Sequence, residues 1–233
     1  MNFLQLVQRF RQEVNYDTSG PTAVTGQTGD HARAVDWVAT AYTELQNRHR
    51  WRWLRKGFTI TTSSGNDTYG YTSAIDTPSG VAISRFKSWS LEDPNNPAKC
   101  YLSSAGKGAE GWLNYLPWAQ LNSIYNIGTQ TDSQPAFISV DRNDDIILGP
   151  QPDNTYVVTG EYEKSAQVLA ADGDTPEMPS DYHMLIVYMA MEDHGSYDSA
   201  NEVLARSAKK GRRLMRQLEN TQLPKMRQAG PMA

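Results

Sequence analysis

Residues 48–60 of this 233-residue chain read RHRWRWLRKGFTI, and the hydrophobic pattern changes within them. Upstream, apolar residues recur every three or four positions, as on one face of an amphipathic helix. Downstream, Phe58 and Ile60 alternate with threonines, which is the two-residue period of a strand. The stretch therefore marks the passage from a helical region to a β region.

Two helices are expected before this point. The first has a single apolar face made of Phe3, Val7, Phe10 and Val14. Residues 15–29 form a polar linker rich in Thr and Gly. Asp30 is expected to cap the second helix, whose buried stripe consists of Ala34, Val38, Ala41 and Leu45.

Several short strands are expected after this point. Their β-branched or aromatic runs are Val81–Lys87, Lys99–Leu102, Ala136–Val140, Asp145–Leu148 and Tyr156–Tyr162. Gly, Pro, Asn and Asp separate the runs, which favours an antiparallel sheet or small barrel. The connection 103–135 is predicted as a long loop holding one short helix, Trp118–Tyr125. Its length exceeds that of ordinary connections, so we expect it to be functional or mobile.

Helical patterning returns at Ser180, directly after Pro179. Gly195 is expected to end this helix, Asp198 or Ser199 to open a last one, and Pro224 to stop it. The sequence therefore predicts an α+β protein. Its terminal helices, 1–56 and 176–223, form a bundle, 57–175 form an inserted β domain, and 224–233 form a flexible tail.

Composition excludes several classes of protein. The single cysteine, Cys100, excludes an intramolecular disulfide framework and a cysteine-rich zinc site. The first residues have neither the basic nor the apolar region of a signal peptide. The longest apolar run, Met184–Met191, is far shorter than the roughly 20 residues of a membrane-spanning helix. A soluble protein made inside a cell is expected, with no membrane contact.

Charge is divided unevenly along the chain, although the total is only −4. Residues 57–200 hold 6 basic and 19 acidic residues, a net charge of −13. The stretch 206–227 holds eight basic residues and one acid, Glu219. Such separation of charge along a chain indicates that parts of the protein bind partners of opposite charge. A solvated helix face and nucleic-acid contact are alternatives, but docking onto an acidic protein surface fits the segregation best.

The basic and aromatic residues of 48–56 have two interpretations. Interleaved Arg and Trp side chains could stack on bases and pair with phosphates. Alternatively, Trp51, Trp53 and Leu54 close the helix-to-sheet junction while the arginines extend to water. We favour the structural interpretation.

The motifs that would carry catalysis are incomplete. Gly106-Lys107-Gly108 lacks the Ser or Thr that a phosphate loop needs after its lysine. Asp141, Asn143 and Asp145 have the first spacing of an EF-hand loop, but Ile146 stands where that loop needs glycine, so a hairpin turn is expected. His183 and His194 are about 16 Å apart along a helix, too far to share a metal. We predict no catalytic, cofactor or metal residues.

The chain resembles the head-to-tail adaptor, or connector, proteins of tailed bacteriophages, as found beneath the portal of short-tailed phages. Three regions carry the resemblance. The first includes Phe3–Glu13, Thr25–Gly29 and Trp51–Leu54. The second includes Asp145–Pro152 with Tyr156 and Gly160–Tyr162. The third is Pro176–His183 with the basic helix that follows. Only the middle, 103–134, has no match.

The resemblance implies a non-enzymatic virion protein in the neck between capsid and tail, assembled in the host cytoplasm. It implies a helical bundle carrying a β domain, in a ring of about twelve copies around the DNA exit channel. Its partners are the portal protein, a tail or nozzle protein and neighbouring copies, while genomic DNA passes without specific binding. The C-terminal segment grips the portal, which assigns that role to Arg206, Lys209, Lys210, Arg212, Arg213, Arg216, Lys225 and Arg227.

The acidic middle adds a further expectation: Asp144 and Asp145 line the channel and repel DNA during ejection. Two alternatives remain open. One is a DNA-binding protein that uses 48–56 together with the basic C-terminal helix, with steeply salt-dependent affinity. The other is a hydrolase working through 103–135, with a metal-dependent activity that needs Asp141 or Asp145.

Overall fold

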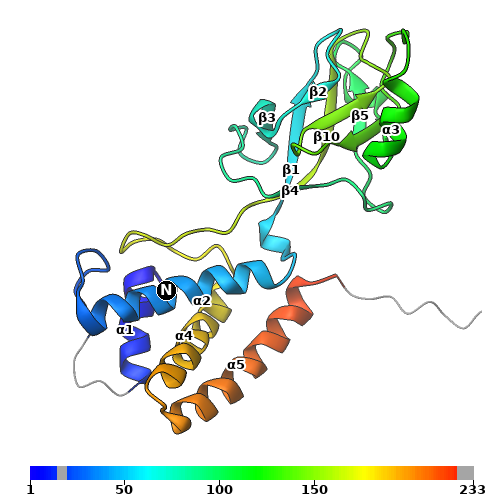
Figure 1. The fold of residues 1–233 in the computed structure, drawn as a ribbon. Coiled ribbons are helices and arrows are strands. Elements are labelled where there is room, and N and C mark those ends of the chain that lie inside the picture. The colour runs from blue at the N-terminus through cyan, green and yellow to red at the C-terminus, as the bar shows by residue number, and fades with distance from the viewer. Residues whose placement is uncertain (15–19, 225–233) are drawn as a thin grey trace, which may run out of the picture. The chain divides into compact units, whose positions relative to one another are not determined.

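The structure is a computed structural model, and residues 1–14 and 20–224 are described (Figure 1). Its helices and two sheets confirm the α+β class. The chain divides into two compact units, Met1–Trp53 with Ala166–Ala233, and Leu54–Ser165. We call them the helical unit and the β unit. The expected domain bounds, 1–56 with 176–223 for a bundle and 57–175 for an inserted β domain, stay predictions.

The first two helices of the helical unit confirm the apolar periodicity. Helix α1, Phe3–Glu13, begins with a capping box between Asn2 and Gln5. Helix α2, Gly29–Arg48, buries Ala34, Val38, Ala41, Tyr42, Leu45 and Gln46. The expected cap at Asp30 is wrong, because Asp30 lies inside the first turn, 3.2 Å from the Arg33 guanidinium. The chain enters that turn through Gly29 at φ +58°, a conformation glycine adopts without strain, so the helix begins before Asp30.

Helix α4, His183–Tyr197, packs against α1, α2 and α5. It is apolar on most sides, as a central helix must be. The expected end at Gly195 is wrong, since α4 continues to Tyr197. The last helix, α5, Asn201–Gln222, opens after Ala200 and not at Asp198 or Ser199. Ser199 has φ +54° and lies in the connection.

A strap formed by residues 166–179 crosses α2 in the helical unit. Gln46, fully buried on α2, donates from Nε2 to the carbonyl of Gln167 (3.0 Å) and accepts from its amide (2.7 Å). The Tyr42 hydroxyl donates to Oε1 of Gln167 (2.9 Å). Leaving the buried Gln46 amide without partners would cost free energy of folding. These bonds therefore fix the position of Gln167, and with it the strap, on α2.

The β unit contains two sheets. The larger is antiparallel, in the order β3 (Ala74–Asp76), β1 (Arg55–Thr61), β10 (Tyr156–Glu163), β5 (Lys99–Leu102) and β6 (Gly111–Trp112). Strand β4, Ser88–Ser90, also pairs with β10. The smaller has the order β2 (Thr68–Tyr69), β9 (Ile146–Gly149), β8 (Phe137–Val140) and β7 (Asn114–Tyr115), with β7 and β8 parallel.

One continuous core joins these strands. Phe58 of β1 lies opposite Gly160 of β10, and a Cβ on that glycine would lie 2.7 Å from the Phe58 ring. Trp89 packs edge-on against Phe58 with ring centroids 4.6 Å apart. The side chains of Phe58 and Ile60 therefore point into the same buried core, as their alternation with threonine predicts.

Two expectations for the β unit are wrong. Residues 81–87 were expected as a strand, yet they form only an isolated bridge between Ala82 and Ile75. Residues 103–135 were expected as a long loop around Trp118–Tyr125. That helix, α3, is present with those bounds, but β6, β7 and the short 3-10 turn Lys107–Ala109 also lie in the stretch. The stretch is therefore partly folded within the β unit, and the expectation that it is functional or mobile stays a prediction.

Candidate assembly surfaces

Helix α5 presents the basic residues expected to bind a partner. Its buried edge consists of Ser207, Gly211, Met215 and Leu218. The basic side chains recur at complementary helical spacings, so they lie on the other sides of the helix. All six described ones are exposed: Arg206, Lys209, Lys210, Arg212, Arg213 and Arg216. Lys225 and Arg227 lie outside the described residues.

Some of these cations are engaged by the helical unit itself. Arg206 donates to the backbone carbonyl of Glu13, and Lys210 Nζ lies 4.0 Å from the Glu13 carboxylate. Arg212 donates from Nε to the carbonyl of Ala208 (3.0 Å). Within 1–14 and 20–224, Lys209, Arg213 and Arg216 have no acid within 4.0 Å. These three cations form the part of α5 best placed to meet an external acidic surface.

A groove of about 490 Å³ lies beside α5, where α2, α4 and α5 meet. Leu185, Met189 and Met215 give it an apolar floor. Its charged lining has both signs: the acids Glu44, Glu192, Asp193 and Glu219, and the cations Arg48, Arg212 and Arg216. Burial, together with the charge of Asp193, raises the pKa of Glu192, and burial together with the charge of Glu44 raises the pKa of Asp193. The sequence analysis missed this acidic set, because Glu44 and Glu192 are distant in the chain and only helix packing joins them.

The turn between β8 and β9 contains the residues expected to line a channel. The amide of Asp141 donates to the carbonyl of Asp145 (2.9 Å), and the Asp141 carboxylate accepts from the amides of Asn143 (2.8 Å) and Asp145 (2.9 Å). This confirms the hairpin turn. Asp144, at φ +62°, is exposed. Burial and the charges of Asp141 and Asp144 raise the pKa of Asp145, so the turn concentrates negative charge.

Trp51 supports the structural interpretation of 48–56. Its side chain is fully buried and donates from Nε1 to the carbonyl of Leu45 (2.7 Å). The Trp53 ring stacks on it at 4.8 Å, and His49 contacts it edge-on at 5.0 Å. A buried indole cannot stack on a nucleic-acid base. The aromatic part of this stretch therefore stabilises the protein.

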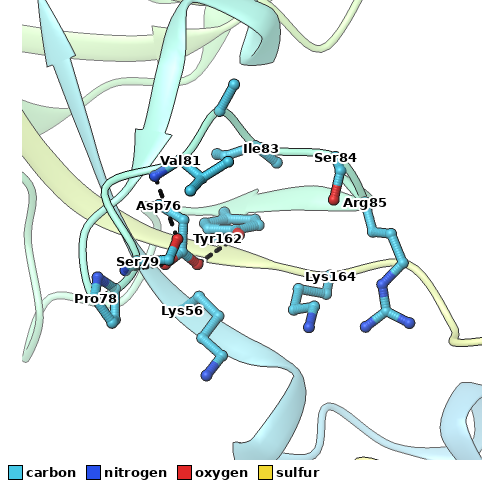
Figure 2. A pocket seen from close by; sticks show the side chains of 11 residues that line it. Lys56, Asp76, Pro78, Ser79, Val81, Ile83, Ser84, Arg85, Tyr162 and Lys164 are labelled. Atoms are coloured by element: carbon cyan, nitrogen blue, oxygen red, sulfur yellow. Dashed lines mark hydrogen bonds between the residues drawn. The ribbon is translucent and has the colours of Figure 1, made fainter.

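A pocket of about 420 Å³ in the β unit has Asp76 at its centre (Figure 2). The Asp76 carboxylate accepts from the Tyr162 hydroxyl (3.0 Å) and from the amide and hydroxyl of Ser79 (3.0 and 2.9 Å). Burial acts to raise the pKa of Asp76, but these bonds and the charge of Lys56 lower it overall. The ionised carboxylate joins the end of β3 to the turn at Ser79 and to Tyr162 of β10. A carboxylate that stays ionised is a poor proton donor.

The other sequence motifs form no site. Gly106 has φ +72° and opens the short 3-10 turn Lys107–Ala109, which is followed by strand β6 and not by the α-helix of a phosphate loop. His183 lies within α4 and bonds to the Met178 carbonyl, while His194 packs between Phe10 and Trp37. No group of three or more His, Cys, Asp or Glu side chains suited to a metal ion occurs among the residues the structure describes. In that part of the chain no helix is long and apolar enough to cross a membrane.

Comparison with known proteins gives one match. The profile of the SU10 adaptor protein family matches residues 1–232, almost the whole chain. The match includes 103–134, the stretch for which the sequence motifs gave no resemblance. No curated protein matches the chain at a significant level.

Proposed function

Because the chain belongs to the SU10 adaptor protein family, a family of phage head-to-tail adaptors, we propose that it forms a ring beneath the portal and joins the capsid to the tail. The family establishes a structural connector role. The ring, its partners and its channel are the further steps of the proposal. They place the protein in the neck of the virion, assembled in the host cytoplasm.

The exposed basic face of α5 is the observation that supports portal binding most directly. Six cations line it over about 15 Å of helix axis. The helix keeps its shape through its buried edge, so its cations need no partner to be positioned. Fixed positive charge of this kind accelerates docking on an acidic surface and selects its orientation. The portal-binding set is Arg206, Lys209, Lys210, Arg212, Arg213 and Arg216, extended by Lys225 and Arg227.

In a ring of identical subunits, one face of each copy binds a different face of the next copy. Each subunit therefore needs two different faces that fit one another. The helical unit offers two surfaces that differ. The exposed face of α5 is basic, whereas the groove between α2, α4 and α5 has an apolar floor and side chains of both charges, with Glu44, Glu192 and Asp193 beside Arg48 and Arg212. Such surfaces support repeated association of identical copies, and we propose about twelve in the ring.

The acidic β8–β9 turn supports a channel through which genomic DNA passes without specific binding. Asp144 and Asp145 carry charge that repels phosphate. A DNA-binding function, the principal alternative, is less well supported, because Trp51 is buried and Trp53 stacks on it. Purified protein that bound duplex DNA with a steep dependence on salt would favour that alternative.

Mass photometry tests the proposal. The full-length chain is measured alone, with the portal ring of the same phage, and with that ring plus the tail or nozzle protein. A species that adds about a dozen 26.1 kDa subunits to the portal supports the adaptor ring. The proposal also requires that deletion of residues 223–233 leaves a folded subunit that no longer joins the portal. A full-length chain that ignores the portal at micromolar concentration contradicts the portal contact.

A further inference from the structure

A second surface of the β unit has a chemistry that the adaptor role does not use. A groove of about 580 Å³ lies where the loop 91–97 faces the short strands β6 and β7. Leu91 and Leu113, both buried, form part of its lining. The strands lie at the edges of their two sheets, so each has a side with no neighbouring strand. The β6 and β7 side of the groove belongs to 103–134, the stretch in which the sequence motifs gave no resemblance.

Trp112 of β6 is the most prominent side chain of this groove. Its side chain is 64% exposed, although an indole ring contributes a large apolar area. Trp112 pairs across the sheet with Lys99, whose Nζ lies 4.9 Å from the ring centroid. Glu110 holds that lysine at 3.3 Å. The ring is therefore positioned before any partner arrives, which lowers the entropic cost of binding.

Tyr115 and two prolines extend the apolar surface. Tyr115 of β7 lines the groove, and its hydroxyl donates to the Glu92 carboxylate (3.1 Å). Pro94 and Pro97 line it from the loop. Aromatic rings set in a shallow, open groove are the surface on which polyproline II segments dock, because such segments are extended and already ordered.

The charged residues of the groove have one sign. Glu92 and Asp93 line it, and no Lys, Arg or His is among its lining residues. Asp93 is fixed by bonds from the amide and side chain of Asn95 (2.9 and 3.1 Å). A ligand that carries a cation would gain from both carboxylates, while a phosphate group would be repelled.

We propose that this groove binds an extended, proline-containing peptide segment that carries an arginine or lysine, supplied by a partner protein. The prolines pack on Trp112 and Tyr115, and the cation pairs with Glu92 and Asp93. A sugar ring would also stack on Trp112. It would then need several free hydrogen-bond donors, whereas the Tyr115 hydroxyl and the Asn95 side-chain amide already donate to the carboxylates of Glu92 and Asp93. The proposal is independent of the portal contact of α5.

The test uses the full chain and a fluorescent synthetic decapeptide with four prolines and one arginine, followed by anisotropy. We expect saturable binding that weakens about tenfold or more in Trp112→Ala, as for truncation of an interface anchor. Ile127→Ala is the matched control, because Ile127 is also 64% exposed in the β unit but does not line the groove. Circular dichroism establishes that both variants keep the fold.

Reversing the charge of Glu92 gives a second test, because loss of the fold could not strengthen the binding of any peptide. Glu92→Lys should weaken the arginine peptide and strengthen the same peptide with glutamate in place of arginine. If Glu92→Lys does not fold, Glu92→Gln should still reduce the preference for arginine. Binding that is unchanged in Trp112→Ala, or that is equal for the two peptides, overturns the proposal. Failure of the peptide to bind, with binding of maltohexaose or duplex DNA through Trp112 instead, also overturns it.

Discussion

Gly195 of α4 lies directly against Leu204 of α5. A Cβ atom built on Gly195 would lie 2.7 Å from Cγ of Leu204 and 3.3 Å from its backbone nitrogen. Real Cβ atoms essentially never lie within 3.0 Å of another heavy atom, so the first of these distances excludes a side chain here. The glycine therefore permits the close approach of the two helices just before the chain turns at residues 198–200. Its position near the end of the apolar pattern predicted a helix stop, but its role is packing.

We predict that Gly195→Ala destabilises the helical unit. The added methyl group overlaps Leu204 and must push α5 away from α4. Overpacking of this kind costs about 1–3 kcal/mol, which exceeds the gain in helix propensity from alanine. The free energy of unfolding, measured by urea titration of the purified subunit, should fall by that amount.

Gly211→Ala is the matched control on α5. A Cβ there would meet Oε1 of Glu192 at 3.5 Å and Cβ of Tyr188 at 3.6 Å, which are ordinary contacts. Alanine at this helical position should raise the free energy of unfolding by about 0.5–1 kcal/mol. Effects of equal sign in the two variants would argue against the packing explanation.

A second prediction concerns Trp51, the buried tryptophan of the stretch where the pattern changes. Trp51→Ala removes the bond to the Leu45 carbonyl and the stack on Trp53. The free energy of unfolding should fall by about 3–5 kcal/mol. Trp112→Ala, which truncates an exposed ring, should change it by no more than about 0.5 kcal/mol. Similar losses in the two variants would contradict the burial of Trp51.

The parts of the fold that sequence predicted well are those with a long or strongly alternating pattern. Lys99–Leu102 and Trp118–Tyr125 have the predicted bounds, because each is one run between clear breakers. Val81–Lys87 has the composition of a strand, yet Ile83 is its only buried residue. Scattered backbone bonds to β3 and to Glu163 of β10 hold this segment in place, without the continuous pairing of a strand. Composition does not distinguish these two arrangements.

The candidate surfaces were predictable only where one element carries them. The basic face of α5 lies on one helix, so its spacing is visible in the sequence. The groove with Glu44 and Glu192, and the groove with Trp112 and Glu92, each combine distant segments. Strands β6 and β7 have two residues each, which is too short for a two-residue period to be recognised. Their position depends on pairing with β5 and β8.

The third prediction concerns pH. Burial lowers the pKa of His183 and of His194 below the usual 6.5. The unfolded chain then binds more protons than the folded chain once the pH falls below 6.5. The stabilising contribution is therefore fully present above pH 6.5 and is lost as the pH falls toward the lowered values. The free energy of unfolding should decrease between pH 7.5 and 5.5.

His183→Gln separates this effect from other titrations. Glutamine does not titrate and can still donate a bond toward the Met178 carbonyl, so the decrease with pH should become shallower. Glu192 and Asp193 have raised pKa values, so their protonation on acidification increases the free energy of unfolding and opposes the effect of the histidines. The measurement is therefore made above pH 5.5. An unchanged slope in His183→Gln would show that this histidine does not control the acid response.

The fourth prediction tests the channel. The double variant Asp144→Asn with Asp145→Asn removes two charges from the β8–β9 turn, and asparagine tolerates the φ of +62° at position 144. If these residues line the channel, virions assembled with the variant should eject DNA more slowly, since the wall repels phosphate less. Asp132→Asn with Asp181→Asn removes two exposed charges elsewhere. Equal ejection kinetics for the wild type and the turn variant would contradict the channel position.

The last prediction concerns the three α5 cations without an acidic partner among residues 1–14 and 20–224. The triple variant Lys209→Ala, Arg213→Ala and Arg216→Ala removes exposed side chains that no described contact needs. Each change should alter the free energy of unfolding by no more than about 0.5 kcal/mol. Association with the portal ring, followed by stopped-flow light scattering, should slow about tenfold and lose most of its dependence on ionic strength.

The matched control, Arg52→Ala with Lys107→Ala and Arg142→Ala, removes the same charge from exposed positions outside α5. It separates local docking from the effect of net charge. If both triple variants slow association equally, the portal responds to the overall charge of the subunit. If neither does, the basic face of α5 is a solvated surface and the portal contact lies elsewhere. Only a loss confined to the α5 variant supports the docking role, because the two proteins differ only in where the charge was removed.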